Sequence, residues 1–179
     1  MTVKFVFEKK PLEAWILCHQ MCNMLERCEE ATFSKSGLTP QQYWVLAAIK
    51  FNTAPVNHRD VANWLGRNTN SITLIVDRME NKGLVKRFRD LPDRRSVRLV
   101  MTPKAEEVFT QVVEPYWDLI SKMMSCLSEE ETQTYIGLLE QVNERAFEHS
   151  YPGAVMEEAK TKDIERTVRE LSKGNGIKA

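Results

Sequence analysis

The stretch NHRDVANWLGRNTNSITLIVDRMENKGLVKRFRDLPDRRSVRLVMTP, residues 57–103, decides the fold. Asn57 can cap a short helix that ends at Gly66, where a glycine can adopt the left-handed conformation of a helix terminus. Asn68 can cap a second helix, which Gly83 ends in the same way. The inward face of this second helix has apolar residues at helical spacing: Ile72, Ile75, Val76 and Met79. The spacing therefore predicts two short helices in succession.

The outer face of the second helix is unusual for a surface helix. It carries mostly short side chains that can form hydrogen bonds, in place of Lys and Glu: Thr69, Asn70, Ser71, Thr73, Leu74 and Asp77. Residues 84–89 and 96–101 then predict two strands, joined by a polar tip over residues 90–95. Two short helices followed by a hairpin with a basic tip predict a winged helix-turn-helix.

Long amphipathic helices flank this domain. Apolar residues recur at helical spacing from Leu12 to Thr32 and again from Phe109 to Leu127, with Pro115 inside the second stripe. The fold class expected is mainly α with a small β-hairpin wing. Its expected parts are an N-terminal dimerisation helix (12–37), a winged helix-turn-helix DNA-binding domain (38–103), C-terminal dimerisation helices (104–150) and a C-terminal extension with a weak helix and a loose tail (151–179).

Charge is segregated along the chain, although its 179 residues have a formal net charge of zero. Residues 38–103 carry 11 basic and 5 acidic side chains, whereas residues 104–179 carry 9 basic and 15 acidic ones. The middle segment is therefore a candidate polyanion-binding module. No apolar run approaches the roughly 18 residues of a membrane span, so we expect a cytoplasmic protein without membrane contact.

Enzyme motifs are not found in the sequence. It has no Gly-rich phosphate loop, no His-Glu-x-x-His and no nucleophile elbow, and its three histidines are scattered. We therefore expect neither enzymatic activity nor a cofactor or resident metal.

Residues 38–103 and the flanking helices resemble the MarR family of bacterial winged-helix transcriptional regulators. The resemblance rests on LTPQ at 38–41, VANWLG at 61–66, ITLIVDRMENKGLV at 72–85 and DRRSVRL at 93–99. It covers roughly residues 12–148, and Ala105 stands where the family usually has glycine. It implies a homodimer on a double-stranded DNA operator, with a small-molecule effector that releases repression.

The expected DNA contacts fall into two elements. The second helix would enter the major groove with Thr69, Asn70, Ser71, Thr73 and Leu74. In the wing, Asp93 can hold Arg95 extended toward a narrow minor groove, and the family resemblance implies the same roles. Solvated surfaces are the alternative for both elements. Further cations would contact phosphates: Arg67, Arg78, Lys86, Arg87, Arg89 and Arg94.

The terminal helices carry more apolar side chains than a small winged helix can cover: Trp15, Met21, Leu25, Trp117, Ile120, Met124, Tyr135, Leu139 and Phe147. A second copy would bury them, and two-fold symmetry would place the two DNA-reading helices about 34 Å apart. We therefore expect a homodimer on a pseudo-palindromic operator. The alternatives are complete packing within one chain and a helical adaptor that binds protein instead of DNA.

The first helix also suggests regulation. Cys18 and Cys22 are one turn apart, which suits a thiol redox sensor or a metal site, but with Cys28 they also follow the apolar stripe. We expect reduced thiols packed in the core. A small effector would bind between the dimerisation helices and the winged helix, and aromatic residues there would otherwise be ordinary core. The candidate lining residues are Trp15, His19, Tyr43 and Trp44.

Overall fold

The computed structural model describes residues 9–89, 97–150 and 152. The expected mainly α fold with a two-stranded hairpin is confirmed. In chain order the elements are α1 (Lys9–Phe33), the 3-10 turn η1 (Ser34–Ser36), α2 (Pro40–Phe51), α3 (His58–Leu65), α4 (Thr69–Asn81), β1 (Val85–Phe88), β2 (Arg98–Met101), α5 (Pro103–Met124) and α6 (Glu129–Ser150).

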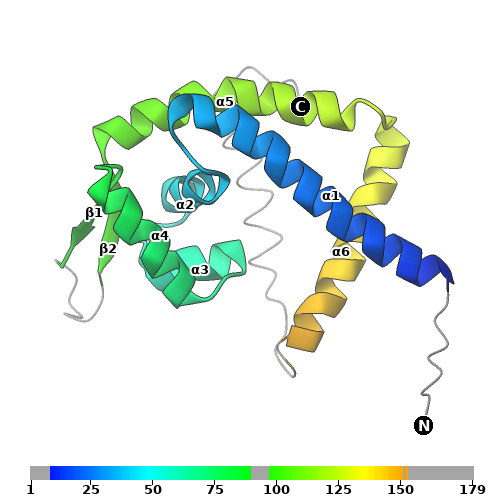
Figure 1. The fold of residues 1–179 in the computed structure, drawn as a ribbon. Coiled ribbons are helices and arrows are strands. Elements are labelled where there is room, and N and C mark those ends of the chain that lie inside the picture. The colour runs from blue at the N-terminus through cyan, green and yellow to red at the C-terminus, as the bar shows by residue number, and fades with distance from the viewer. Residues whose placement is uncertain (1–8, 90–96, 151, 153–179) are drawn as a thin grey trace, which may run out of the picture.

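The elements form a compact head and a long-helix frame (Figure 1). The head contains α2, α3, α4 and the hairpin, which lie together on one side of the molecule. From the head, α5 runs along the top of the view, and α6 descends from its far end. α1 crosses the frame diagonally and packs its C-terminal part on α5 and α2.

The helix starts read from the sequence are confirmed. Thr39 and Gln42 form a reciprocal capping box at the start of α2, and Asn57 forms one with Asp60 at the start of α3. The Asn68 side chain accepts from the backbone N–H of Ser71 at 2.8 Å and caps α4. These side chains satisfy N–H groups that have no partner inside the helix, which is why the helices begin at those residues.

An aromatic cluster joins the frame to the head. Tyr43 of α2 stacks between Phe33 at the end of α1, with ring centroids 4.6 Å apart, and Phe109 of α5, at 5.1 Å. Tyr116 completes the cluster, and its hydroxyl donates to the Glu29 carboxylate at 2.6 Å. Burial and Glu29 both raise the pKa of the Tyr116 phenol well above its ordinary value. The rings therefore fix the angle between α1, α2 and α5.

The hairpin is attached to the head at its base. Val85 pairs with Met101 and Phe88 with Arg98 in antiparallel register. The Leu99 N–H donates to the Val56 carbonyl at 2.8 Å, which ties β2 to the loop before α3. The wing tip with Asp93, Arg94 and Arg95 lies outside the described residues, as does the C-terminal extension apart from Pro152.

The departure at Ala105 is accommodated at the start of α5. Ala105 is fully buried, and its backbone N–H donates to the Thr102 hydroxyl that caps the helix. The methyl group fills core space where glycine would leave a gap.

The frame helices are largely uncovered in the single chain. α1 buries only Phe33 of its 25 residues, and α6 buries none of its 22. The expectation that Cys18 and Cys22 pack in the core is wrong for the single chain, because both thiols are exposed. α6 meets α1 at Met21, between the two cysteines, but leaves both thiols exposed.

Candidate nucleic-acid interface

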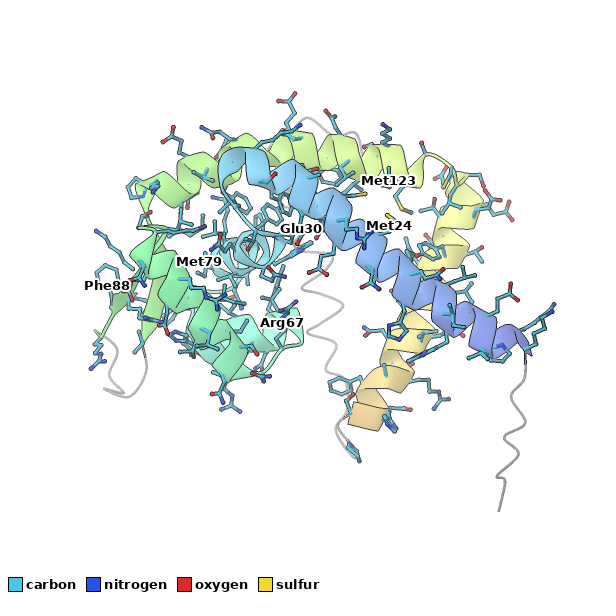
Figure 2. All side chains as sticks on the ribbon, in the orientation of Figure 1. Met24, Glu30, Arg67, Met79, Phe88 and Met123 are labelled. Carbon is cyan, nitrogen blue, oxygen red and sulfur yellow. The ribbon has the colours of Figure 1, made fainter. Side chains whose placement is uncertain are left out.

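α4 presents a free face built from short side chains. On its opposite face, α4 buries Ile72, Val76 and Met79 against the rest of the head. Met79 is labelled in Figure 2. Thr69 and Asn70 are exposed in the first turn, and Leu74 is 60% exposed one turn later. Ser71 and Thr73 are half-buried between these residues and the head. All five predicted base-reading residues therefore lie on the free side of one helix, the side that a DNA groove would meet.

Thr73 has part of its hydrogen-bonding capacity in use. Its hydroxyl donates to the Thr69 carbonyl one turn earlier at 2.9 Å. The hydroxyl oxygen can still accept a hydrogen bond, so Thr73 can accept from a base.

A basic groove follows one edge of α4. It lies between α4 and the start of α2, has a volume of about 610 Å³, and includes the cations Arg67, Arg78 and Lys82 in its lining. Figure 2 shows Arg67 beside the turn between α3 and α4. Arg67 and Arg78 are exposed, as phosphate contacts require.

Sequence reasoning missed Lys82 as a contact, because a lysine at the end of a helix is also common as part of a helix stop signal. Its ammonium donates to Gln42 Oε1 at 3.3 Å and lies 3.4 Å from the Gly37 carbonyl oxygen. Lys82 therefore links the end of α4 to the junction between α1 and α2 while adding positive charge to the groove.

Arg87, a predicted phosphate contact, is paired with two carboxylates within the chain. Its guanidinium donates to Asp77 Oδ1 at 2.5 Å and to Glu80 Oε2 at 2.6 Å, and only 23% of its side chain is exposed. Because both carboxylates already occupy the guanidinium, Arg87 fastens β1 to α4 and is not a free cation.

The other predicted wing cations lie differently. Lys86 and Arg89 are exposed on or next to β1. Phe88 is 39% exposed at the outer edge of the hairpin (Figure 2). The Arg98 guanidinium lies 4.8 Å from the centroid of the Phe88 ring. Sequence reasoning missed Arg98, since only strand register reveals its place opposite Phe88. This stacked pair adds a positive charge at the wing base.

The four predicted effector residues do not form one pocket within a single chain. Trp15 and His19 contact each other edge-on with ring centroids 4.9 Å apart, on an exposed part of α1. Tyr43 is a core residue stacked on Phe33, and Phe33 lies roughly 27 Å along the helix from Trp15 at 1.5 Å per residue. Trp44 is half-buried, and lines a cavity of about 220 Å³ with Gln41, Leu65, Arg67 and Ile75.

The Cys22 thiol of the first helix is not activated. Partial burial and the neighbouring Cys18 raise the pKa of the Cys22 thiol, so its thiolate is less populated at neutral pH. Within the described part of the chain, no three His, Cys, Asp or Glu side chains gather where a metal ion could be held. The described helices also include none that is long and apolar enough to cross a membrane.

Comparisons with known proteins agree with this geometry. The MarR family model matches residues 38–97. The HTH-type transcriptional repressor MdtR of Bacillus subtilis (strain 168) is 32% identical over 108 residues, which are 60% of this chain and 66% of MdtR. The organohalide-sensing regulator RdhR in its 2,4-dichlorophenol-bound form has a TM-score of 0.74 at 21% identity, covering 86% of this chain and 94% of RdhR.

A mutant MarR from E. coli complexed with operator DNA has a TM-score of 0.69 at 22% identity, covering 77% of this chain and 99% of that MarR. At these identities the two structures are evidence for the fold alone. The family model and MdtR are evidence from the sequence of the winged domain. The chain therefore belongs to the MarR family of winged helix-turn-helix transcriptional regulators.

Proposed function

We propose that this regulator is a cytoplasmic homodimer that represses transcription by binding a pseudo-palindromic DNA operator. The observation that carries the proposal is the free face of α4, with Asn70, Thr73 and Leu74 beside a groove containing Arg67 and Arg78. Short polar side chains read base edges, and the flanking cations supply phosphate contacts that fix the register. The solved complex of E. coli MarR with operator DNA supports this use of the fold.

Two-fold assembly follows from the uncovered frame helices. Large apolar side chains are exposed along α1 and α6: Leu12, Trp15, Ile16, Leu17, Met24, Leu25, Ile136, Leu138, Leu139 and Val142. A patch of this extent is rare on monomers, and a second copy offers the same helices in return. A homodimer buries the patch and presents two copies of α4 to one face of the DNA.

Release by a small effector is the regulatory mode that we propose. The organohalide-sensing neighbour RdhR with bound 2,4-dichlorophenol supports the capacity of this fold to hold an aromatic molecule. In this chain Trp44 lines a cavity between α2, α3 and α4 that adjoins the basic groove, since both are lined by Gln41, Arg67 and Ile75. A molecule there would bias the position of α4, which is how an effector would alter DNA affinity.

The test is to select random duplexes on the purified protein and to titrate the binding of the recovered duplex with salt. A specific DNA binder should recover a two-fold related pair of half-sites. Its affinity should fall steeply as salt rises, because the release of counterions from DNA contributes less entropy at higher salt. A helical adaptor for proteins should enrich no sequence. Failure to enrich any duplex would contradict the proposal.

Arg95 remains a proposed minor-groove contact in the wing. Arg95→Ala should lower affinity on every duplex, most on sites with A·T-rich flanks, and make the salt slope shallower by about one unit. Unchanged titration curves on both operator and random duplex would remove Arg95 from the interface.

A further inference from the structure

Four charged or titratable side chains meet where the wing joins the helix-turn-helix. This wing junction consists of His58 at the start of α3, Asp77 and Glu80 on α4, and Arg87 on β1. Arg87 is the centre of the group. Its Nη1 donates to Glu80, while its Nη2 donates to Asp77 and lies 3.3 Å from His58 Nε2.

The chemistry of the pair assigns the tautomer of His58. A guanidinium has only N–H donors and no acceptor, so Nε2 must accept the hydrogen bond and carry no proton. His58 is therefore neutral in this arrangement. Protonation of Nε2 would remove the lone pair and place two N–H groups against each other, which breaks the contact between α3 and β1.

Charged side chains face His58 from β1 and from α4. Arg87 faces it from β1, and Asp77 and Glu80 face it from α4. On its own helix, Arg59 is exposed and the Asp60 carboxylate accepts from the Asn57 N–H at 2.8 Å. The only charged residue of α2 is Lys50, which pairs with Glu106.

Burial lowers the pKa of His58 below its ordinary value, and Arg87 lowers it further against the opposing effect of Asp77 and Glu80. The first turn of α3 also disfavours an imidazolium, since the helix dipole is positive there. The fold consequently prefers neutral His58. The unfolded chain binds the proton more readily, so stability falls as pH drops below about 6.5 and levels off beneath the folded-state pKa.

We propose that His58 is a proton-sensitive positioning residue for the wing, whose neutral imidazole holds Arg87 and whose protonation releases the wing base and weakens DNA binding. The inference rests on the proposed DNA-binding function, because the wing is one of its two DNA-contacting elements. Once protonated, His58 competes with Arg87 for Asp77 and Glu80, so α4 also loses part of its tie to β1. The regulator should therefore release its operator under acid conditions.

The experiment measures operator affinity at fixed ionic strength at about pH 7.5 and about pH 5.5, on either side of the ordinary histidine pKa. Four proteins are compared: wild type, His58→Gln, His58→Ala and the control His149→Gln on α6. Glutamine keeps an acceptor that does not titrate in this range, whereas alanine has none. Thermal unfolding of the same proteins without DNA is recorded at both pH values.

Wild type and His149→Gln should lose about three- to tenfold in affinity at the lower pH, the amount that corresponds to one net hydrogen bond. His58→Gln should lose less than about twofold, and His58→Ala should already bind weakly at the higher pH and lose nothing further. An equal loss in wild type and His58→Gln would overturn the inference, as would a wild type that binds equally well at both pH values.

The unfolding measurements separate this inference from the proposed function. If the protein binds no duplex at any pH, the DNA-binding proposal fails, while the pH dependence of unfolding still tests the junction. Wild type should lose more thermal stability than His58→Gln between the two pH values. Identical losses in the two proteins would refute a proton-sensitive His58.

Discussion

Arg78 and Arg87 differ in role although both are basic residues beside the proposed DNA surface. Arg78 is exposed on α4 and lines the basic groove, whereas Arg87 is held by Asp77 and Glu80. Arg78→Ala should change the free energy of unfolding by less than about 0.5 kcal/mol, yet make the salt slope of DNA binding shallower by about one unit. Denaturant unfolding and salt titration measure the two effects.

Arg87→Ala should affect mainly the stability of the fold. Removing the guanidinium leaves the Asp77 and Glu80 carboxylates, whose side chains are 48% and 40% exposed, without their partner and should lower the free energy of unfolding by about 1 kcal/mol. Adding Asp77→Asn and Glu80→Gln to the Arg87→Ala protein serves as the matched control. The neutral amides should recover part of the lost stability. An Arg87→Ala protein as stable as wild type would mean that the ion pairs contribute nothing.

Asn70 carries the clearest test of base reading. Asn70→Ala removes an exposed amide from the first turn of α4 and should cost on the order of 1–3 kcal/mol on the selected operator but little on random duplex. Asn23→Ala makes the same change on exposed α1 and should cost nothing on either duplex. Equal losses on both duplexes would show that Asn70 contacts phosphate and reads no base.

The residue scale also shows where sequence reasoning stops. The free face of α4 was predictable, because a repeat of 3.6 residues states which side chains share a face. The partners of Arg87 were not, since His58 lies 29 positions earlier and only the fold brings it to the guanidinium. A charged residue near an expected DNA surface looks the same in sequence whether it is free or paired.

Among the elements, α4 begins at an Asn68 cap that supports its exposed first turn. Asn68 supplies the acceptor for the first turn of the helix that carries Thr69 and Asn70. Asn68→Ala should lower the free energy of unfolding by about 1 kcal/mol and weaken operator binding, because the first turn frays. Asn68→Ser should retain most of both properties, since serine is also a good cap. The measurements are denaturant unfolding and operator affinity; equal behaviour of the two variants would exclude a capping effect.

The helix boundaries were readable because caps act locally. Thr39 with Gln42, and Asn57 with Asp60, are three residues apart, and their bonds need no tertiary context. The surroundings of α1 were not readable in the same way. A stripe containing Cys18 and Cys22 states which face is apolar but not which element covers it, and among the described residues both thiols are left exposed.

The whole molecule has two parts. The head has a buried core, whereas the frame helices leave many apolar side chains exposed. The aromatic cluster around Tyr43 buries the junction between the two parts. Beyond that junction, α1 touches α6 through the hydrogen bond from Tyr135 to the Met21 sulfur, at 3.0 Å. Of the side chains expected to need a partner, Trp15, Leu25 and Leu139 are exposed, and the rest are half-buried: Met21, Trp117, Ile120, Met124, Tyr135 and Phe147.

The last prediction concerns this open frame. Light scattering should give about twice the 20.7 kDa chain mass at micromolar concentration. Leu139→Glu should shift the protein to monomer, because two-fold symmetry repeats the substitution and removes about 3–6 kcal/mol of apolar burial per dimer. Gln133→Glu, an exposed position on the same helix, adds the same charge and should leave the mass doubled.

Operator affinity then tests whether assembly serves DNA binding. A monomer engages one half-site at a time and loses the effective concentration that links the second, so Leu139→Glu should weaken binding to the full palindrome by more than about a hundredfold. Its affinity for an isolated half-site should stay the same, since α4 and the wing base are untouched by the change. A folded Leu139→Glu monomer that holds the whole palindrome as tightly as wild type would show that the apolar frame serves another partner.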